Sequence, residues 1–386
     1  MGKSAKVLML ASVASMIDLF NKTTIAVLEE AGCLVDIAAN FQFGSITSQI
    51  RVDEYKAELQ DCGKNVYDIP IPRSVLDIKN IIRSYRLLVT LSNEKHYDIV
   101  HVHSPIGGIL GRLAFRKSRR TGTKVMYTAH GFHFYIGAPF LNWILFYPLE
   151  KWCSRYTDVL ITINQEDYLR SKSFYALRNE FVPGIGINVD KISKTEVNKN
   201  QLRNSLGLRD DDFVVMSTGQ LSVRKNHQVI IRAISRLHNP KIKYLIVGFG
   251  ELEDMLRTLA IDMGIEKQVI FAGYRSNVNE LLHIADAFAL PSLQEGLSVA
   301  LMEAMAAGLP VVCSKIRGNV DLIEDCKGGF LYDVYDEKGF AEGIKMLYDS
   351  RLDKTMGLLN LERARCCDAT LVANKMERIY RAVLES

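Results

Sequence analysis

Short runs of aliphatic and β-branched residues alternate with longer stretches of helical periodicity along most of this chain. Runs that are apolar on both faces and separated by helices are typical of a parallel sheet covered on both sides, so the pattern predicts an α/β fold. The first series of expected strands is Lys6–Ala11, Leu34–Ala39, Asp98–His103, Lys124–Ala129, Asp158–Asn164 and Phe181–Pro183. The clearest expected helices among them are Asn21–Ala31 and Ile78–Glu94.

A second series of the same kind follows a polar stretch, Lys191–Arg209, which is rich in Lys and Asn. A chain of 386 residues is too long for one ordinary core. We therefore expect two Rossmann-like lobes, 1–190 and 191–370, with parallel sheets facing across a cleft, followed by a helical segment, 371–386. The expected strands and helices of the second lobe are Phe213–Thr218, His227–Leu237, Lys243–Val247, Glu251–Met263, Val269–Ala272, Val278–Ala285, Ala287–Leu290, Val299–Ala307 and Val311–Cys313.

Composition narrows the class of protein further. The formal net charge of +4 is too small to indicate binding to nucleic acid, so we expect no such partner. The seven cysteines are scattered without a CxxC pair or a Cys/His spacing, which favours reduced thiols in a cytoplasmic protein over a metal site. Serines and Asp18 interrupt the apolar N-terminal run, which therefore predicts a first strand rather than a signal peptide. No stretch reaches the ~20 apolar residues of a membrane span.

The most informative segment runs from Pro291 to Val312 and reads PSLQEGLSVALMEAMAAGLPVV. It predicts a loop after a strand, then a helix that ends at Gly308, and then another strand. Glu295 lies in the loop and Glu303 lies more than a turn inside the helix, so the two carboxylates are staggered along one ligand. This arrangement suits the binding of hydroxyls at two points of a ligand better than an acid and a base that flank one bond.

Gly296, Leu297 and Ser298 lie between the two glutamates and present free backbone N–H groups at a helix N-terminus, a natural seat for phosphate. The whole segment, PSxxEGxxxxxxEAMAxGxPVV, resembles the signature of family 4 (group 1) retaining glycosyltransferases of the bacterial capsule and exopolysaccharide type. The resemblance covers the whole chain, including 11–20 (ASVASMIDLF) and 104–108 (SPIGG). It implies the GT-B fold, a nucleotide diphosphate sugar as donor, which we expect to be a UDP-sugar, and a final helix that returns to the first lobe.

A basic turn, Gly219-Gln-Leu-Ser-Val-Arg-Lys-Asn-His, follows the first strand of the second lobe. By resemblance, Lys225 is the family's diphosphate-binding lysine and acts in catalysis. Gln220 replaces the arginine that the family commonly has after the glycine, so one fixed positive group that would contact the diphosphate is missing. In our interpretation Arg224 compensates for it and binds the donor. The alternative is that Arg224 and Lys225 are a solvated charge pair in a turn.

Three further loops of the second lobe match the family. Val247-Gly-Phe-Gly-Glu-Leu resembles its VGxGxL turn and places Gly248 at the donor, although a GxG alone indicates little. Tyr274 and Arg275 begin the loop that, by resemblance, wraps the nucleotide base. Residues 317–321 resemble the closing loop near the donor sugar, although their Asn and Asp are equally typical of turns and helix caps.

By resemblance, the first lobe binds the acceptor and supplies a histidine to the donor sugar. Ser12 and Ser15 lie where the family has a glycine-rich loop, and small residues there allow a substrate to approach the backbone. His130 ends a strand and is assigned to the donor sugar, as a catalytic residue. His133 is assigned to the acceptor or to internal packing. His103 and the histidine two residues before it point the same way from one strand, and His103 is the better candidate for the acceptor.

Retaining transfer without an obvious catalytic base is consistent, by resemblance, with front-face substitution, in which the leaving diphosphate accepts the proton of the acceptor hydroxyl. Lys225 and the helix N-terminus stabilise the charge that develops on the leaving group. Glu295, as a catalytic residue, binds sugar hydroxyls, and Glu303 binds ribose hydroxyls. No DxD-type acidic pair occurs in a suitable setting, so we expect no metal and no other cofactor.

Two stretches of the first lobe predict contact with a membrane surface. Residues 132–149 are dense in aromatic and aliphatic side chains but too short to span a bilayer, and 112–120 carry five basic residues at largely helical spacing. We expect a peripheral protein that docks on anionic lipid at the inner face of the plasma membrane, where a polyprenyl-diphosphate-linked saccharide is presented as acceptor. The alternative is a buried helix and a solvated basic face. The basic residues are Arg112, Arg116, Lys117, Arg119 and Arg120.

Other functions are less compatible with these motifs. A sugar-nucleotide epimerase of the same fold would convert a UDP-sugar without an acceptor, and a phosphorylase would need a cofactor-binding lysine site that we do not identify. The intact set of Lys225, Glu295 and Glu303 disfavours a non-catalytic sugar-binding partner of a polysaccharide assembly complex. The lack of GxGxxG after the first strand disfavours a dinucleotide oxidoreductase.

Overall fold

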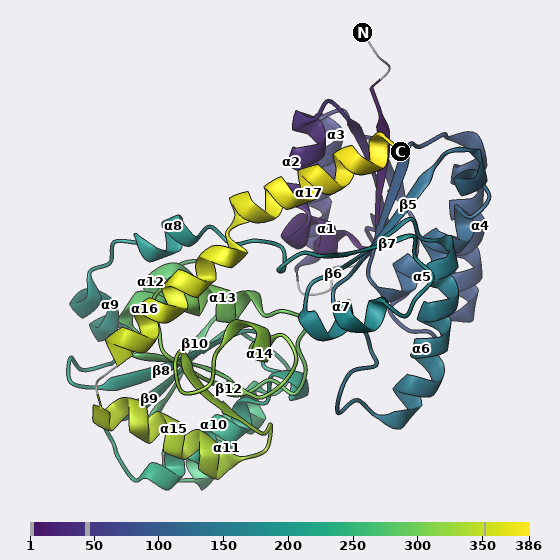
Figure 1. The fold of residues 1–386 in the computed structure, drawn as a ribbon. Coiled ribbons are helices and arrows are strands. Elements are labelled where there is room, and N and C mark those ends of the chain that lie inside the picture. The colour runs from purple at the N-terminus through teal and green to yellow at the C-terminus, as the bar shows by residue number, and fades with distance from the viewer. Residues whose placement is uncertain (1–3, 43–46, 351–352) are drawn as a thin grey trace. The chain divides into compact units, whose positions relative to one another are not determined.

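The computed structural model describes residues 4–42, 47–350 and 353–386, which form two compact units (Figure 1). Unit 1 comprises the chain up to Ile185 together with Thr370–Ser386, and unit 2 is Gly186–Ala369. We predicted boundaries after residues 190 and 370. The first boundary lies earlier because two short helices of unit 2, α8 (Val189–Ser193) and α9 (Lys199–Ser205), occupy the beginning of the polar stretch.

In its described part, unit 1 is built on a parallel sheet of seven strands in the order β3-β2-β1-β4-β5-β6-β7. The order reverses between β1 and β4, which are neighbours in the sheet but not in the chain. The strands are β1 (Lys6–Val13), β2 (Leu34–Asn40), β3 (Val66–Asp68), β4 (Ile99–His103), β5 (Lys124–Ala129), β6 (Val159–Thr162) and β7 (Arg178–Phe181). The helices between them are α1 (Ala14–Phe20), α2 (Lys22–Glu30), α3 (Gln49–Asp61), α4 (Ile78–Glu94), α5 (Pro105–Ala114), α6 (Phe140–Cys153) and α7 (Gln165–Ser171).

Helix α5 lies very close to the sheet because three of its residues are glycines. A Cβ atom on Gly107 would approach Ser104 Oγ to 2.9 Å, and one on Gly108 would approach the ring of Tyr127 to 2.7 Å. A Cβ atom on Gly111 would lie 2.5 Å from a side chain of β4. Any larger residue at these positions would displace the helix, so the SPIGG sequence seats α5 directly against β1, β4 and β5.

The C-terminal helix α17 (Ala369–Leu384) packs on unit 1 (Figure 1). Its residues Val372, Met376, Ile379 and Val383 are buried in the same core as β1 and β2. Their spacing of three and four residues forms one apolar stripe on the helix. Each fully buried side chain of this kind contributes roughly 1.5–3 kcal/mol, which is enough to anchor the end of the chain.

The described part of unit 2 has a parallel sheet of six strands in the order β10-β9-β8-β11-β12-β13. The strands are β8 (Phe213–Thr218), β9 (Ile242–Val247), β10 (Val269–Gly273), β11 (Ala287–Leu290), β12 (Val311–Ser314) and β13 (Gly329–Tyr332). The remaining helices are α10 (His227–Leu237), α11 (Glu253–Asp262), α12 (Val278–Ile284), α13 (Val299–Ala306), α14 (Asn319–Leu322), α15 (Glu337–Ser350) and α16 (Asp353–Ala364).

Some elements differ from the predicted ones. Strand β1 continues to Val13 and α1 begins at the next residue, so the loop expected at 11–16 is a strand end followed by a helix. Strand β7 ends at Phe181, before its predicted position, because Pro183 cannot donate a hydrogen bond to a neighbouring strand. Strands β3 and β13 were not predicted, since runs of three and four residues carry too little periodicity.

Candidate active site

The strand order of unit 2 reverses between β8 and β11, which pair in the sheet although they are far apart in the chain. Strand β9, which follows β8 in the chain, lies on the other side of β8. Loops that leave the carboxyl ends of strands at such a reversal diverge, and α/β sheets bind ligands there. Arg224 and Lys225 follow β8, and Glu295 follows β11. The topology of unit 2 thus brings these three predicted residues to one place.

Lys225 and Glu295 form a nearly buried ion pair. Lys225 Nζ donates a hydrogen bond to Glu295 Oε1 at 2.8 Å, and the two side chains are only 11% and 10% exposed. Arg224 approaches the same oxygen at 3.0 Å and donates to the carbonyl of Gln294 at 3.1 Å, but its side chain is about half exposed. The N–H of Leu293 donates to the Arg224 carbonyl at 2.8 Å, so backbone contacts also join the two loops.

The neighbouring cations set the charge of Glu295. Burial alone raises the pKa of this carboxyl, but Lys225 and Arg224 outweigh burial, and the pKa is lowered overall. The sequence placed Arg317 in the loop expected near the donor sugar but gave it no role of its own. Arg317 is buried and donates from Nε to the Glu295 carbonyl at 3.2 Å. Its signal in the sequence is the next residue, Gly318, where a Cβ atom would lie 2.3 Å from the carbonyl oxygen of the residue after Glu295.

Helix α13 begins directly beyond this ion pair. Ser298 is its N-cap and accepts a hydrogen bond from the N–H of Leu301 at 3.4 Å. Within the described residues, the backbone N–H groups of Gly296, Leu297 and Ser298 donate no hydrogen bond. These groups, together with the positive end of the helix dipole, make the start of α13 attractive to an anion such as a diphosphate.

Glu303 is the fifth residue of α13 and lies more than a turn inside the helix, as predicted. Desolvation raises the pKa of its carboxyl to about 7. The two glutamates therefore differ in their electrostatics. Cations keep Glu295 ionised, whereas Glu303 gains and loses its proton near neutral pH.

Glycines allow the loops after β8 and β9 to meet. Gly248 has a φ of +145°, and a Cβ atom on it would lie 1.9 Å from the carbonyl oxygen of Gly219. A Cβ atom on Gly250 would lie 2.4 Å from the carbonyl oxygen of Leu221. These two backbone contacts leave no space for a side chain, so the GxG of the sequence is required by packing between the loops.

Tyr274 and Arg275, which we predicted at the nucleotide base, follow β10. Tyr274 is 75% exposed, and its ring meets that of Phe249 edge-on, with the centroids 6.3 Å apart. Arg275 Nε donates to Asn277 Oδ1 at 3.3 Å. The carbonyl before Tyr274 accepts a hydrogen bond from the N–H of Gly248 at 2.8 Å, which brings this loop beside the loop after β9.

In unit 1, His101 and His103 of β4 and His130 after β5 form a stack that we call the histidine column. His103 Nδ1 lies 3.1 Å from His130 Nε2, and the rings of His101 and His103 have centroids 4.2 Å apart. His101 contacts the Tyr380 hydroxyl of α17 at 2.5 Å. Desolvation lowers the pKa of His101 to about 3 and that of His130 to about 4, and it also lowers the pKa of His103. All three are therefore uncharged at neutral pH.

His103 does not have the position that we predicted for an acceptor-binding residue. It is buried, with one ring nitrogen on His130 and the other, Nε2, 3.0 Å from Met9 Sδ. Because both nitrogens are engaged inside unit 1, the side chain supports His130 rather than reaching a substrate. Its alternation along β4 predicted the direction of the side chain correctly but could not show its depth.

Ser12 and Ser15 are both buried. Ser12 Oγ lies 2.7 Å from Ser104 Oγ and accepts a hydrogen bond from the N–H of Gly107 at 3.0 Å, so it joins β1 to the start of α5. Ser15 lies in the first turn of α1. The predicted open loop of small residues is therefore wrong, although Ser12 still lines the cavity described next, which Ser15 does not.

A cavity of about 580 Å³ opens at the carboxyl ends of β1, β4 and β5 in unit 1. His133 lines it, as does Phe146, against which the His133 ring packs with the centroids 4.8 Å apart. Other lining residues are mostly apolar and come largely from β1, α5, α6 and the loop between β5 and α6. They include Val13, Ile106, Ile109, Phe132, Phe134 and Leu149. We call this space the α5–α6 cavity.

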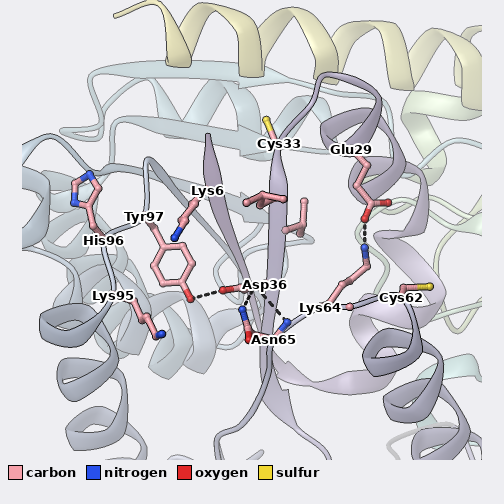
Figure 2. A pocket seen from close by; sticks show the side chains of 13 residues that line it. Lys6, Glu29, Cys33, Asp36, Cys62, Lys64, Asn65, Lys95, His96 and Tyr97 are labelled. Carbon is pink, nitrogen blue, oxygen red and sulfur yellow. Dashed lines mark hydrogen bonds and ion pairs between the residues drawn. The ribbon is translucent and has the colours of Figure 1, made fainter. Parts of the chain in front are cut away.

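A smaller hollow of about 220 Å³ lies at the opposite, amino edge of the same sheet (Figure 2). Its polar side chains already bind one another. Lys64 pairs with Glu29, and Asp36 accepts hydrogen bonds from Asn65 and from the Tyr97 hydroxyl, the latter at 2.8 Å. Since parallel sheets bind ligands at their carboxyl edge, the α5–α6 cavity is the better candidate for a substrate.

Residues 112–120 do not form the exposed basic face that we predicted. Arg112 is completely buried and pairs with a glutamate of α6, and Arg119 donates to Asp158 at 2.9 Å. Arg116 also donates inside unit 1, and only Lys117 and Arg120 of the five are exposed. The helical spacing was misleading because the glycines of α5 press the face that carries Arg112 against the sheet.

Residues 132–149 divide into two groups. Phe132 and Phe134 are buried and stack with centroids 4.8 Å apart. In contrast, Ile136 and Phe140 are 80% and 78% exposed. Leu141, Ile144 and Leu145 of α6 are also exposed. Among the described helices, none is both long and apolar enough to cross a membrane. Internal packing and an apolar surface therefore both occur, at different residues of the stretch.

No group of three or more His, Cys, Asp or Glu side chains in the described ranges is arranged to hold a metal ion.

Comparison with known proteins agrees with this geometry. Residues 23–175 match the model of Glycosyltransferase Family 4, and 198–358 match that of Glycosyl transferases group 1. EpsD of Bacillus subtilis, a putative glycosyltransferase, is 36% identical over 98% of this chain and 97% of its own length. A UDP-Gal:alpha-D-GlcNAc-diphosphoundecaprenol alpha-1,3-galactosyltransferase of Escherichia coli is 31% identical over 74% of this chain and 73% of its own.

A solved structure shares the fold. Anabaena Alr3699/HepE in complex with UDP-glucose superimposes with a TM-score of 0.76 at 20% identity, over 98% of this chain and 99% of that one. Two units, each with a parallel sheet, constitute the GT-B fold that the sequence predicted. The chain therefore belongs to the group 1, family 4 glycosyltransferases, with relatives in bacterial exopolysaccharide synthesis.

Proposed function

We propose that this glycosyltransferase moves a hexose unit, with retention of configuration, from a UDP-sugar to a lipid-linked saccharide during synthesis of a bacterial surface polysaccharide. The observation that carries the proposal is the Lys225–Glu295 ion pair beside the unbonded N–H groups at the start of α13. The UDP-glucose bound to HepE and the diphosphoundecaprenol-linked acceptor of the Escherichia coli relative support the two substrate classes.

The site suits departure of a diphosphate. Lys225 Nζ and the N–H groups of Gly296 and Leu297 stabilise the negative charge that grows on the leaving oxygen. The ionised Glu295 accepts hydrogen bonds from hydroxyls of the donor sugar, and Glu303 accepts them from the ribose. The bond from the anomeric carbon to the diphosphate breaks, the acceptor oxygen bonds to that carbon on the same face, and the acceptor proton passes to the leaving diphosphate.

His130 remains the proposed catalytic histidine of unit 1. Because its pKa is about 4, it acts as a neutral hydrogen-bonding group and not as a cation. We also propose that transfer needs no metal, since Lys225, Arg224 and the start of α13 supply positive charge to the diphosphate. Activity should then persist in excess EDTA, and activity that returns only with Mg²⁺ or Mn²⁺ would contradict this part of the proposal.

We propose further that α6 docks the protein on the inner face of the plasma membrane. Phe140, Ile144 and Leu145 provide an exposed apolar surface on this helix. Cations lie beside its aromatic residues, since Arg170 covers the ring of Trp143 at 4.4 Å. An apolar helix face with adjacent cations is typical of binding to anionic lipid. The proposed membrane-docking surface therefore consists of residues of α6 and not of residues 112–120.

Vesicle flotation tests the docking surface. The wild type should float with vesicles of phosphatidylglycerol and remain in solution with phosphatidylcholine alone. The double variant Ile144→Ser, Leu145→Ser should lose flotation without loss of donor hydrolysis. Equal flotation of the wild type and this variant would contradict the role of α6.

The enzymatic proposal is tested by incubating the purified protein with UDP-glucose, UDP-galactose or UDP-N-acetylglucosamine and a GlcNAc-diphospholipid. We expect transfer from at least one donor, and the anomeric proton of the product should show the α configuration of the donor. A β-linked product would exclude retention. Conversion of a UDP-sugar to its epimer without an acceptor would exclude transfer as the main reaction.

A further inference from the structure

The α5–α6 cavity has apolar walls but contains one carboxylate, Glu150 of α6. Glu150 is buried, and its Oε2 accepts a hydrogen bond from Arg112 Nη2 at 2.7 Å. Arg112 is completely buried, donates from Nε to the Gly108 carbonyl at 2.9 Å, and stacks over the Tyr127 ring at 4.2 Å. Of the two charged residues, only Glu150 lines the cavity.

Stability alone does not explain this ion pair. Replacement of a buried pair by apolar residues of the same volume is often neutral or stabilising by about 1–4 kcal/mol. The pair is also incompletely satisfied, because Arg112 Nη1 has no hydrogen-bond partner within the described residues. Among those residues, the second carboxylate oxygen, Glu150 Oε1, has only the Tyr127 hydroxyl at 3.5 Å, which is the outer limit of a hydrogen bond. Incomplete satisfaction beside an open cavity indicates a ligand.

The charges define the chemistry of that ligand. Arg112 balances Glu150, so a cation gains little from this carboxylate, and the carboxylate repels a phosphate or diphosphate. Arg73 also lines the cavity, but it is exposed to solvent, where water screens its attraction for an anion. A neutral ligand with O–H or N–H donors satisfies Glu150 Oε1. Its apolar faces can pack on the rings of Phe132 and Phe146. A hexose ring with hydroxyl or acetamido groups has both features, and a volume of about 580 Å³ lies in the range of ligand pockets.

We propose that the α5–α6 cavity binds the neutral terminal sugar of the acceptor and that Glu150 accepts a hydrogen bond from one of its hydroxyl or acetamido groups. Arg112 is a positioning residue whose hydrogen bond to Oε2 orients the carboxylate. This inference rests on the proposed function, because it names where the saccharide of that acceptor binds. The diphosphate of the acceptor stays outside the cavity.

The test compares two variants with one control. Glu150→Gln keeps the shape of the side chain but removes its charge and leaves Arg112 unpaired. The double variant Arg112→Met, Glu150→Leu restores an apolar core without a buried charge. Asp158→Asn is the matched control, because Asp158 also accepts a hydrogen bond from an arginine but does not line the cavity. The measurements are thermal melting, and kcat and KM for α-D-GlcNAc-diphosphoundecaprenol.

Loss of a hydrogen bond to a charged group corresponds to a change of roughly tenfold to hundredfold in affinity. We expect Glu150→Gln and the double variant to raise the acceptor KM by at least tenfold, with a smaller effect on kcat. The double variant should melt no lower than the wild type. The control should keep the wild-type KM. A double variant with a wild-type acceptor KM would show that the pair is structural and would overturn the proposal.

Direct binding separates failure of this inference from failure of the proposed function. Saturation-transfer NMR with methyl N-acetyl-α-D-glucosaminide should give a signal with the wild type and none with the double variant. Transfer by the wild type with no such signal would overturn the sugar subsite alone. A signal that depends on Glu150, in a protein that transfers no sugar, would support the subsite and refute the proposed transfer reaction.

Discussion

Replacing Glu303 by Gln tests the electrostatic difference between the two glutamates of the donor loop. Glutamine keeps the size of the side chain but cannot ionise. Desolvation raises the pKa of Glu303 from 4.5 to about 7. The buried position in α13 therefore destabilises the ionised carboxylate relative to the same group in water. The substitution should therefore stabilise unit 2 at alkaline pH while it weakens binding of the donor.

The size and sign of the effect follow from proton linkage. Below pH 4.5 the carboxyl is protonated in both the folded and the unfolded chain and contributes nothing. Between pH 4.5 and about 7 the unfolded chain releases its proton while the folded chain keeps it, so the free energy of unfolding falls by about 1.4 kcal/mol per pH unit. Above pH 7 the loss is complete, at about 3 kcal/mol. Glu303→Gln should remove this loss.

Glu295→Gln is the matched comparison, with the opposite sign. The pKa of Glu295 is lowered in the folded state, so its ionised form stabilises the protein above the unfolded pKa, and this contribution is lost as the pH falls through the folded pKa. Glu295→Gln should therefore destabilise unit 2 at pH 8, and the difference from the wild type should shrink in acid.

The assay must report on unit 2 alone. Both tryptophans, Trp143 and Trp152, lie in unit 1, so their fluorescence follows the other unit. The thiol of Cys313 in β12 is completely buried and reacts only when unit 2 opens. Because Cys62, Cys326 and Cys366 are exposed and react in the folded protein, labelling by a pyridyl disulfide must be read at Cys313 itself, by peptide mass spectrometry. Followed across a urea series at pH 5 and pH 8, this labelling gives the free energy of unfolding. Equal differences at the two pH values, or the same sign for both variants, would refute the reasoning.

Three further outcomes are expected. Gly248→Ala places a Cβ atom 1.9 Å from a backbone oxygen, so calorimetry should show a loss of about 1–3 kcal/mol in stability and a loss of UDP binding. Gly63→Ala, at a positive φ of +73° with open space around the Cβ position, should keep UDP binding. Lys225→Met should lower kcat by about a hundredfold or more, and Arg224→Met, half exposed, by no more than about tenfold. His103→Phe should lower kcat with unchanged UDP affinity by calorimetric titration, and a wild-type kcat would exclude a role for the histidine column.

Local periodicity predicted much of the fold. The predicted bounds of the helix Ile78–Glu94 and of the strand Lys124–Ala129 agree with the structure. Both elements could be predicted because the spacing of apolar residues within a single element indicates its type and its length. Lys225 and Glu295 were predicted as one site although 70 residues separate them. That prediction needed two loop motifs and the rule that parallel strands present their carboxyl ends at one edge.

Depth of burial was not predictable, because it depends on partners from other elements. Arg112 has the helical spacing of a surface residue, yet its partner Glu150 lies 38 residues away and the glycines of α5 hold it against the sheet. His103 has the right direction for a substrate contact, but His130 and Met9 occupy its nitrogens. In each case the same residue type at the same spacing occurs both at exposed and at buried positions, and only the packing of neighbouring elements decides which one is formed.

The Lys225–Glu295 pair also orients the donor. An ammonium group has three donors, so Lys225 can keep its bond to Glu295 Oε1 and still turn toward a diphosphate at the start of α13. Glu295 repels the diphosphate but accepts hydroxyls, which directs the sugar to the carboxylate and the phosphates to the lysine. A second lysine in place of Glu295 would bind the diphosphate more tightly before reaction as well as during it, and so would lower KM without raising kcat.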